Sequence, residues 1–388
     1  MKIYRFSSAI IALLLMLPVV ATGQNSLPLA HHVSVNVPVQ ASTSVRALSA
    51  DRPLVHAMET PLVSPVPHNW RLQATLPGTI IHDISFASPT TGFAAAEGGQ
   101  VWKTTNGGKT WAEALNLGYP YYFYGVSALT TSDVVVSGFY DSSTFYSLIR
   151  WSHDGGDTWS DDIVLSSTSW VQRVRFPNGN SNDGLIMDLI GGSSGNTAQY
   201  TTDGGAAATD WTTVIDNPAG NWFGLQFTLL SNLHARASGI NFCKSGNGGA
   251  KWMCGPSVDS VFDGPVFFLN DADGWVGGGE ITPNVEGWAH MTADGGKTWS
   301  ARTLDGPWPI RELLFLNPKM GWAAGGNLYT NVGGIYFSRD GGQTWSVDVT
   351  TNAEMDACDK QPAQTGYHVW CAGYDGSLNG VIYSLNIK

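Results

Sequence analysis

Three acidic residues stand at or near the start of apolar segments that share a pattern, and their type suits hydrolytic chemistry. Asp83 lies in one such segment, Asp263 precedes a second and Glu312 begins a third. Two carboxylates that flank a glycosidic bond form the usual catalytic set of glycoside hydrolases. If the protein is an enzyme, we therefore expect glycoside hydrolysis, with Asp83 and either Asp263 or Glu312 as the catalytic pair.

Aromatic and arginine side chains stand close to the starts of the same segments. Aromatic faces beside carboxylates and amides fit sugar rings, which have apolar faces and polar edges. The alternative interpretation is that these rings pack in the core, where large apolar side chains are usually found. The candidates for ligand contact are Tyr124, Trp170, Arg173, Trp222, Trp308 and Arg311.

Other residues of similar type fall in equivalent loops and extend this aromatic and acidic set. Before the first segment of each unit they are His82, Tyr121, Tyr122, Asn221, Glu354 and Asp356; between the second and third segments they are Tyr140, Asp141, Glu280, Glu286, Trp288, Tyr329, Tyr374 and Asp375.

A repeated turn in the sequence indicates which structural elements position these residues. Residues 292–299 read TADGGKTW, and the same formula, Ser/Thr-x-Asp/Asn-Gly-Gly-x-Thr-Trp, recurs with small changes five more times. Asp or Asn bonds neighbouring amides through its side chain, and the glycine pair supplies backbone angles closed to other residues. The tryptophan begins the returning strand and covers a large apolar area. The acidic or amide positions of the six copies are Asn106, Asp154, Asp203, Asn247, Asp294 and Asp340.

Each turn belongs to a unit of four apolar segments. The tryptophans of the turns fall at 111, 159, 211, 252, 299 and 345, so the spacings are 48, 52, 41, 47 and 46 residues. That spacing is typical of one four-stranded blade of a β-propeller. The turn resembles the Asp-box of β-propeller proteins, in which it is a folding element. The wider pattern of residues 69–388, including SPTTGFAAAEGGQVWKTTNGGKTW from Ser88, is similar to the photosystem II assembly-factor type of propeller and to the sialidase-like propellers.

The two ends of the repeat region predict a seventh blade. Three further apolar segments follow Trp345, and the chain stops at Ser384-Leu385-Asn386, where another turn would begin. The missing strand is at the other end, since residues 69–76 resemble residues 298–304. We therefore predict an all-β fold, a seven-bladed β-propeller of four-stranded antiparallel blades, closed by pairing of the N-terminal strand with the C-terminal blade. Closure removes the exposed sheet edges of an open array.

The resemblance to sialidases implies a catalytic set that the sequence does not complete. Such enzymes need three arginines around the substrate carboxylate, which guanidinium forks bind well. Only Arg173 and Arg311 stand at suitable inner positions, and residues 70–73 read WRLQ without the proline of the expected motif. Catalysis is therefore the secondary hypothesis.

Composition excludes several other classes of function. The net charge of −11 becomes −13 once Lys2 and Arg5 leave with a leader, and no Lys/Arg cluster suggests nucleic-acid binding. The nine histidines do not have the spacing of a zinc site. The Gly-Gly pairs do not stand at the start of helices, as the glycines of phosphate-binding loops do. The repeated turns are too short to form calcium-binding loops. We expect no metal, no cofactor, no membrane span and a monomer.

Residues 1–23 read as a secretory signal peptide, with a basic start, a short apolar core and small residues before the cleavage point. Residues 24–68 are rich in proline and poor in aromatic residues, which indicates a disordered extension or pro-segment ahead of one propeller domain, 69–388. Export makes disulfides the preferred state of the four cysteines, with buried free thiols as the alternative. The predicted pairs are Cys243–Cys254, which face each other across a turn, and Cys358–Cys371, on consecutive segments.

These features together predict a secreted protein, extracellular or periplasmic. Our hypothesis is a non-catalytic binding or assembly module for a protein or glycan ligand, because the structural repeats are complete and the catalytic set is not. The alternative is an extracellular glycoside hydrolase, sialidase-like or endoglucanase-like, with its carboxylate pair on the face around the central channel.

Overall fold

The four-segment units of the sequence fold as four-stranded antiparallel sheets. The computed structural model describes residues 68–388 except 168, 178–181, 191–195, 215–225, 232–233, 240, 257, 259–262, 281–285, 302, 305–307, 328–329 and 331. For residues 169–170, 187–190, 196–197, 263, 280, 286 and 303 only the backbone is described. The predicted signal peptide and the extension as far as residue 67 lie outside the described residues.

Seven sheets, here called blades 1 to 7, follow one another along the chain. Blade 1 contains β2 (Ile81–Phe86), β3 (Gly92–Ala96), β4 (Gln100–Thr104) and β5 (Ala112–Asn116). Blade 2 contains β6 (Tyr121–Ala128), β7 (Val134–Asp141), β8 (Phe145–Ser152) and β9 (Ile163–Ser166). Blade 3 contains β10 (Ser169–Arg175), β11 (Gly184–Ile190), β12 (Asn196–Thr201), the short 3-10 helix η1 (Ala208–Asp210) and β13 (Thr212–Val214).

The later blades repeat this order. Blade 4 contains β14 (Gln226–Leu229), β15 (Ala235–Ser238), β16 (Cys243–Ser245) and β17 (Trp252–Cys254). Blade 5 contains β18 (Asp263–Phe268), β19 (Gly274–Glu280), β20 (Glu286–Thr292) and β21 (Thr303–Leu304), and blade 6 contains β22 (Ile310–Phe315), β23 (Gly321–Asn327), β24 (Val332–Ser338) and β25 (Ser346–Thr351). Blade 7 contains β26 (Ala353–Pro362), β27 (Tyr367–Asp375), β28 (Gly380–Ile387) and β1 (Arg71–Leu76).

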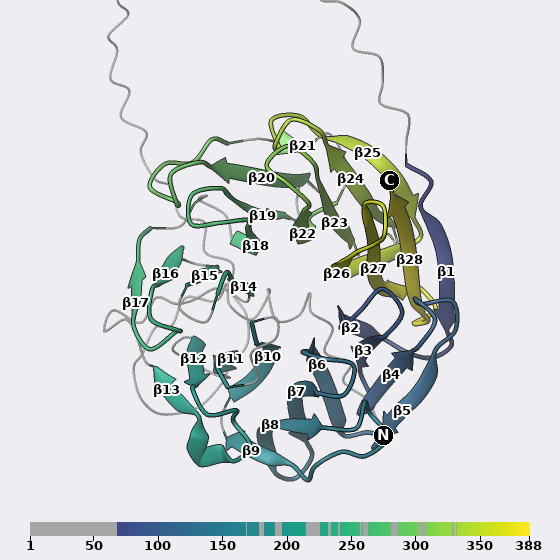
Figure 1. Cartoon of the computed structure of the whole chain (residues 1–388), viewed down its shortest axis with the longest axis vertical. Coiled ribbons are helices and arrows are strands. Elements are labelled where there is room, and N and C mark those ends of the chain that lie inside the picture. The colour runs from purple at the N-terminus through teal and green to yellow at the C-terminus, as the bar shows by residue number, and fades with distance from the viewer. Residues whose placement is uncertain are drawn as a thin grey trace, which may run out of the picture. The chain divides into compact units, whose positions relative to one another are not determined.

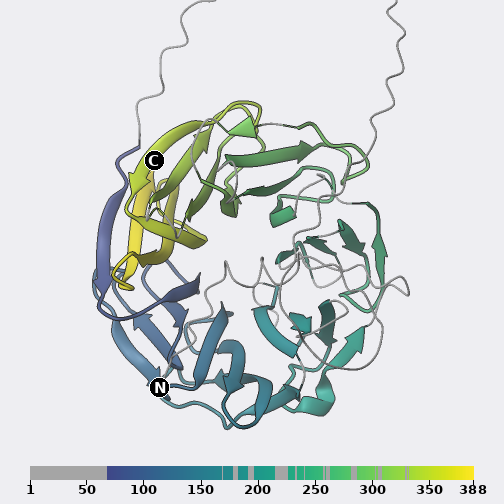
Figure 2. The same ribbon diagram turned by 180° about the vertical axis from the view of Figure 1, so that it is seen from behind.

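The seven blades form a closed ring, as predicted. The first strand of each blade lies nearest the centre and contacts the first strand of the next blade (Figure 1). β1 pairs antiparallel with β28, from Arg71 opposite Ser384 to Leu76 opposite Gly380, so the N-terminal strand completes the last blade. The purple β1 lies beside the yellow β28 in both views (Figure 2). The fold is therefore a seven-bladed β-propeller.

A buried carboxylate fastens the point of closure. Asp348 on β25 accepts hydrogen bonds from the backbone N–H of His68 at 2.7 Å, from Nε1 of Trp70 at 2.8 Å and from Nε1 of Trp322 at 2.9 Å. Asp348 is only 6% exposed, and a carboxylate in that setting is stable only when its oxygens are bonded. Blade 6 thus holds the segment that leads into β1.

The repeated turns connect the third and fourth strands, and their bonds stay within the turn. In the turn after β20, Thr292 Oγ1 donates to Asp294 Oδ1 at 2.8 Å and accepts from the N–H of Gly296, while Asp294 Oδ1 accepts from the N–H of Thr298. Gly295 and Gly296 have φ angles of 74° and 80°, which only glycine adopts easily. The Ser/Thr-to-Asp/Asn bond is present in all six copies.

The hydrophobic core fills the spaces between neighbouring blades. Trp275 of β19 stacks on Phe315 of β22 at 3.6 Å, and its Nε1 donates to the carbonyl of Gly341 in the next blade's turn. Trp370 of blade 7 repeats this contact with Phe86 and with the carbonyl of Gly107 in blade 1. Each turn is therefore tied to the preceding blade, and the glycine pair leaves room for that approach.

Both predicted disulfides are present. Cys243 and Cys254 are opposite each other on β16 and β17, and Cys358 and Cys371 are opposite each other on β26 and β27. Each closes a local hairpin.

Candidate functional site

Irregularities in the inner strands determine which side chains reach the centre of the ring. The pairing register of first and second strands shifts by one residue in six blades. Such a β-bulge interrupts the alternation of side chains between the two faces and re-aims the extra residue. In five of these blades the extra residues are His82 on β2, Tyr124 on β6, Gln172 on β10, Arg311 on β22 and Asp356 on β26. In blade 5 the shift falls between Asp263 and Val266 of β18.

The residues that follow the bulges form ion pairs across the ring. Nη2 of Arg173 lies 3.0 Å from Oε2 of Glu312 and 3.4 Å from the carbonyl of Asp356, although β10 and β22 lie on opposite sides of the centre (Figure 1). Arg175 binds Asp83 with both terminal nitrogens, at 2.7 and 3.0 Å. Asp83 also accepts the backbone N–H groups of Ile84 and Val126. Two candidate catalytic carboxylates, Asp83 and Glu312, therefore connect strands of different blades.

A second group, here called the central cluster, contains charged residues and two tyrosines. Its members are His82, Arg311, Glu354, Asp356, Tyr124 and Tyr374. Nε of Arg311 lies 3.0 Å from Oε1 of Glu354, and Nδ1 of His82 lies 3.6 Å from Oδ2 of Asp356. The His82 ring stacks on Tyr124 with centroids 3.9 Å apart, and its Nε2 contacts Glu97 at 3.2 Å. Glu354 and Tyr374 are opposite each other on β26 and β27.

Burial and mutual repulsion shift the pKa values of this cluster. Burial lowers the pKa of His82, but hydrogen bonding to Asp356 and Glu97 outweighs it and raises the pKa to about 9. Burial raises the pKa of Glu354 to about 8 against the opposing effect of Arg311, and Asp356 adds to the rise. The pKa values of Tyr124 and Tyr374 are raised by burial and by the nearby carboxylates.

Several polar atoms of the central cluster make no hydrogen bond. Among the described residues, Glu354 Oε2 and Arg311 Nη2 are buried without one, and Asp356 Oδ2 has only the ion-pair contact with His82 at 3.6 Å. Glu354 is 2% exposed, and its contact with Arg311 is an ion pair without a linear hydrogen bond. A buried polar atom left without a bond costs about 1–3 kcal/mol, and more if it is charged. Such atoms are candidates for ligand contact.

Aromatic rings continue outward from the central cluster along blade 2. The Phe139 ring lies 5.5 Å from that of Tyr124 and stacks on Tyr122 at 4.9 Å. Tyr122 contacts Tyr119 at 5.5 Å, and Phe139 contacts Phe145 at 5.8 Å. We call Tyr119, Tyr122, Phe139 and Phe145 the aromatic strip. Tyr119 is 66% exposed, so the strip begins at the cluster and ends at the surface.

The other predicted ligand contacts are placed differently. Trp308 is 2% exposed and packs on Tyr336 at 5.0 Å within the core cluster between blades 5 and 6. For Trp308, the structure therefore shows the core packing that we gave as the alternative. Only the backbone is described for Trp170 and Asp263, and Trp222 lies outside the described residues.

The structure places Glu354 and Asp356 at the centre of the ring. The sequence analysis named these two residues only in the wider aromatic and acidic set. A pattern in the inner strands marks such positions: two polar or small residues interrupt the apolar run, as in Ile81-His82-Asp83-Ile84 and Ile310-Arg311-Glu312-Leu313. That interruption is the sequence trace of the bulge. The pairing partners of these residues come from other blades and are not visible in the local sequence.

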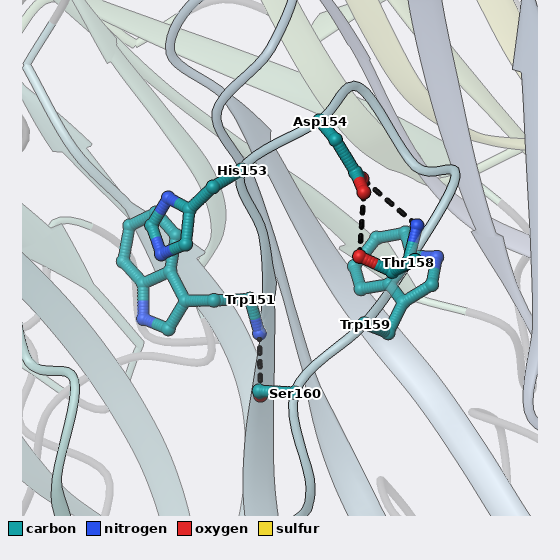
Figure 3. Close-up of a pocket in the computed structure, with 6 residues that line it drawn as sticks. All are labelled: Trp151, His153, Asp154, Thr158, Trp159 and Ser160. Atoms are coloured by element: carbon teal, nitrogen blue, oxygen red, sulfur yellow. Dashed lines mark hydrogen bonds between the residues drawn. The ribbon is translucent and has the colours of Figure 1, made fainter.

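A surface depression of about 340 Å³ lies beside the repeated turn of blade 2. It is lined by Trp151, His153, Asp154, Thr158, Trp159 and Ser160. Figure 3 shows that the Asp154 carboxylate is aimed at Thr158, whose N–H and Oγ1 both donate to it, while His153 stacks over Trp151. The carboxylate is therefore already satisfied by its own turn.

The described part of the chain has neither a metal-binding group of side chains nor a helix that could span a membrane. No group of three or more His, Cys, Asp or Glu side chains there is arranged to hold a metal ion. No helix within it has the length and apolar character needed to cross a bilayer.

Comparison with known proteins identifies structures of the same fold. No protein-family model and no curated protein matches the sequence. Among solved structures, YCF48 bound to D1 peptide has a TM-score of 0.59 and 17% identity, covering 82% of this chain and 97% of that chain. YCF48 from Cyanidioschyzon merolae has a TM-score of 0.58 and 18% identity, covering 82% and 98%. An ancestral GH74 enzyme has a TM-score of 0.55 and 14% identity, covering 81% and 47%.

At these identities the similarity establishes the fold and nothing finer. The chain is a seven-bladed β-propeller with a polar, partly unsatisfied centre.

Proposed function

We propose that this protein is a secreted, non-catalytic binding or assembly module whose protein or glycan ligand contacts the central cluster and the aromatic strip. The observation that carries the proposal is the set of buried atoms that make no hydrogen bond, Glu354 Oε2, Asp356 Oδ2 and Arg311 Nη2. A ligand that bonds these atoms offsets the cost of burying them.

The central cluster is one of several connections between blades. Arg173–Glu312 and Arg175–Asp83 connect blade 3 with blades 6 and 1, and β1 closes the circle. The cluster therefore adds polar groups to a framework that has other connections between its blades. Buried polar groups that the framework does not use are good candidates for a functional site.

Other features support a binding module that acts outside the cytoplasm. The two disulfides fit an oxidising compartment and agree with the predicted signal peptide. The repeated turns have the sequence of the Asp-box and bond as folding elements. YCF48, which has this fold, has been solved bound to D1 peptide, so a propeller of this kind can hold a peptide.

Peptide and glycan arrays probed with the purified protein test the proposal. We expect selective binding to one class of array, and loss of that binding in a Glu354→Gln/Asp356→Asn double variant. The matched control is Asp294→Asn in a repeated turn, where Asn106 and Asn247 show that an amide serves equally well. Binding that is identical in the wild type and the double variant would contradict the proposal.

Glycoside hydrolysis is the second candidate, because Glu354, with its pKa raised by burial to about 8, lies near Asp356. A carboxylic acid that stays protonated near neutral pH can act as a general acid. Turnover of aryl sialosides or plant β-glucans, abolished by Glu354→Gln, would favour this candidate. Activity abolished by Asp83→Asn, Asp263→Asn or Glu312→Gln instead would favour the catalytic pair proposed from the sequence.

A further inference from the structure

The charges in and beside the central cluster do not balance. Two carboxylates of the cluster, Glu354 and Asp356, and the adjoining carboxylate of Glu97 meet two cationic groups, those of His82 and Arg311. The neighbouring pairs, Arg173–Glu312 and Arg175–Asp83, are neutral in themselves and contribute no spare positive charge. A buried site with an excess carboxylate favours a proton or a bound cation.

The aromatic side chains in and around the cluster also favour a bound cation. The faces of aromatic rings carry partial negative charge and attract ammonium and guanidinium groups. Tyr124 and Tyr374 border the cluster, and the aromatic strip leads away from it. Glu97 and Asp141 lie close enough to Tyr122 to raise its pKa together with burial, so the strip has an acidic border.

We propose that the central cluster accepts the positively charged side chain of a basic peptide, while the flanking peptide residues lie across the aromatic strip. This inference rests on the binding function proposed above and specifies its ligand. Glu354 Oε2 and Asp356 Oδ2 accept hydrogen bonds from the lysine ammonium or arginine guanidinium of the peptide.

An anionic ligand fits the same residues poorly. Arg311 is already 3.0 Å from Glu354, and Arg173 is engaged by Glu312. An added carboxylate or phosphate would join three carboxylates in a site that excludes most water, where repulsion between like charges is strong. The cluster therefore discriminates by charge.

The aromatic strip favours a peptide over a free cation. Its successive ring centroids are 5.5, 4.9 and 5.5 Å apart from Tyr124 through Phe139 and Tyr122 to Tyr119. An extended peptide advances about 3.3 Å per residue, so the strip spans several residues of a bound chain. Aromatic rings supply a large contact area at little entropic cost.

An array of random hexapeptides tests the chemical class of the ligand. We expect the bound peptides to be enriched in Lys and Arg and depleted in Asp and Glu. For a selected basic peptide, Glu354→Gln and Asp356→Asn should each weaken binding about tenfold or more, because each removes a charge-assisted bond. Tyr122→Ala should weaken binding about threefold to tenfold through the strip. Asp294→Asn should bind like the wild type.

The outcomes separate this inference from the proposed function. Peptides without a basic preference, or with an acidic one, whose binding is still lost in Tyr122→Ala would overturn the cationic ligand but leave the binding site intact. Selective binding to glycans alone would do the same. Binding that no variant of the cluster or strip alters would overturn both proposals. Near-ultraviolet circular dichroism checks each variant for folding; if Glu354→Gln does not fold, Asp356→Asn and Tyr122→Ala decide the same question.

Discussion

The repeated turns and the inner strands both carry polar groups and differ in how those groups are satisfied. In a turn such as Ser338–Trp345, the hydrogen bonds of the Ser338 and Asp340 side chains join residues two to four positions apart. In the centre, Arg175 reaches Asp83 across 92 positions of sequence and Arg173 reaches Glu312 across 139. Local bonds repeat because local sequence repeats. Distant bonds depend on which blades meet, so each inner strand carries different residues.

The same contrast appears in the pKa values. Hydrogen bonds from Thr158 lower the pKa of Asp154 in its turn to about 2. Burial instead raises the pKa of Glu354 in the centre to about 8. The hydrogen bonds of the turns thus stabilise the charged form of their carboxylates, whereas burial at the centre destabilises the charged form. A structural role explains the first arrangement, and the ligand proposed above would account for the second.

The largest expected effect comes from breaking an ion pair at the centre. Asp83→Ala leaves the half-buried Arg175 without its partner and the N–H of the buried Val126 without an acceptor. We expect the free energy of unfolding to fall by about 3–5 kcal/mol, measured by urea denaturation. The control is Asp157→Ala, which removes an exposed pair with Lys103 and should cost less than about 0.5 kcal/mol. Equal effects of the two substitutions would contradict the contrast drawn here.

A pH dependence of stability should come from the centre. The folded-state pKa values of His82 and Glu354 are raised from 6.5 and 4.5 to about 9 and about 8, so the folded chain binds more protons. Their contribution is complete below the unfolded pKa values and is lost as pH rises through the folded ones. The free energy of unfolding should therefore decrease between about pH 5 and pH 9, by several kcal/mol in total.

A His82→Asn/Glu354→Gln double variant should flatten this slope. The lowered pKa of a turn carboxylate such as Asp154 stabilises the fold above the unfolded pKa of 3.8, and that stability is lost only as pH falls toward 2. The turns therefore contribute nothing to the slope between pH 5 and pH 9. A slope that persists in the double variant would place its origin outside the central cluster.

A smaller effect is expected in the repeated turns. Ser338 is 1% exposed, and its Oγ accepts from the N–H of Gly342 at 2.7 Å and donates to Asp340. Ser338→Ala leaves that N–H without a partner and should cost about 1–2 kcal/mol in denaturant melts. Ser338→Thr is the matched control, since threonine stands at the same position in residues 104, 201 and 292. A loss of stability in Ser338→Thr as large as in Ser338→Ala would show that the hydroxyl is not the cause.

The smallest effect on stability should come from Glu354, which we propose as a ligand contact. Glu354→Gln replaces a buried carboxyl whose oxygens lack hydrogen bonds with a neutral amide of similar size, so we expect a change of less than about 1 kcal/mol. At pH 9 the variant should be at least as stable as the wild type, because the wild type must then ionise a buried carboxyl. A loss near that of Asp83→Ala would show that Glu354 holds the ring together.

The sequence by itself determined the number and kind of blades. Each turn, such as Thr292–Trp299, encodes its own hydrogen bonds and positive φ angles within eight residues, so the six copies mark six of the seven blades. The unpaired segments at the two ends, residues 69–76 and 381–386, predicted the closure that β1 and β28 make. The disulfides followed from the same register, because Cys243 and Cys254 are equidistant from their turn.

Only the tertiary structure decided what each inner residue does. The sequence suggests Asp83 and Glu312 as a catalytic pair, and the structure shows that each is ion-paired, with Arg175 and Arg173 of blade 3. Trp308, a ligand contact predicted from the sequence, is buried and packs on Tyr336. The bulges at His82, Arg311 and Asp356 shift a strand by one residue, and each of these three residues has an ion-pair partner in another blade. Local sequence fixes a turn because its bonds are local; the centre of a ring is fixed by residues that meet only after all seven blades have closed.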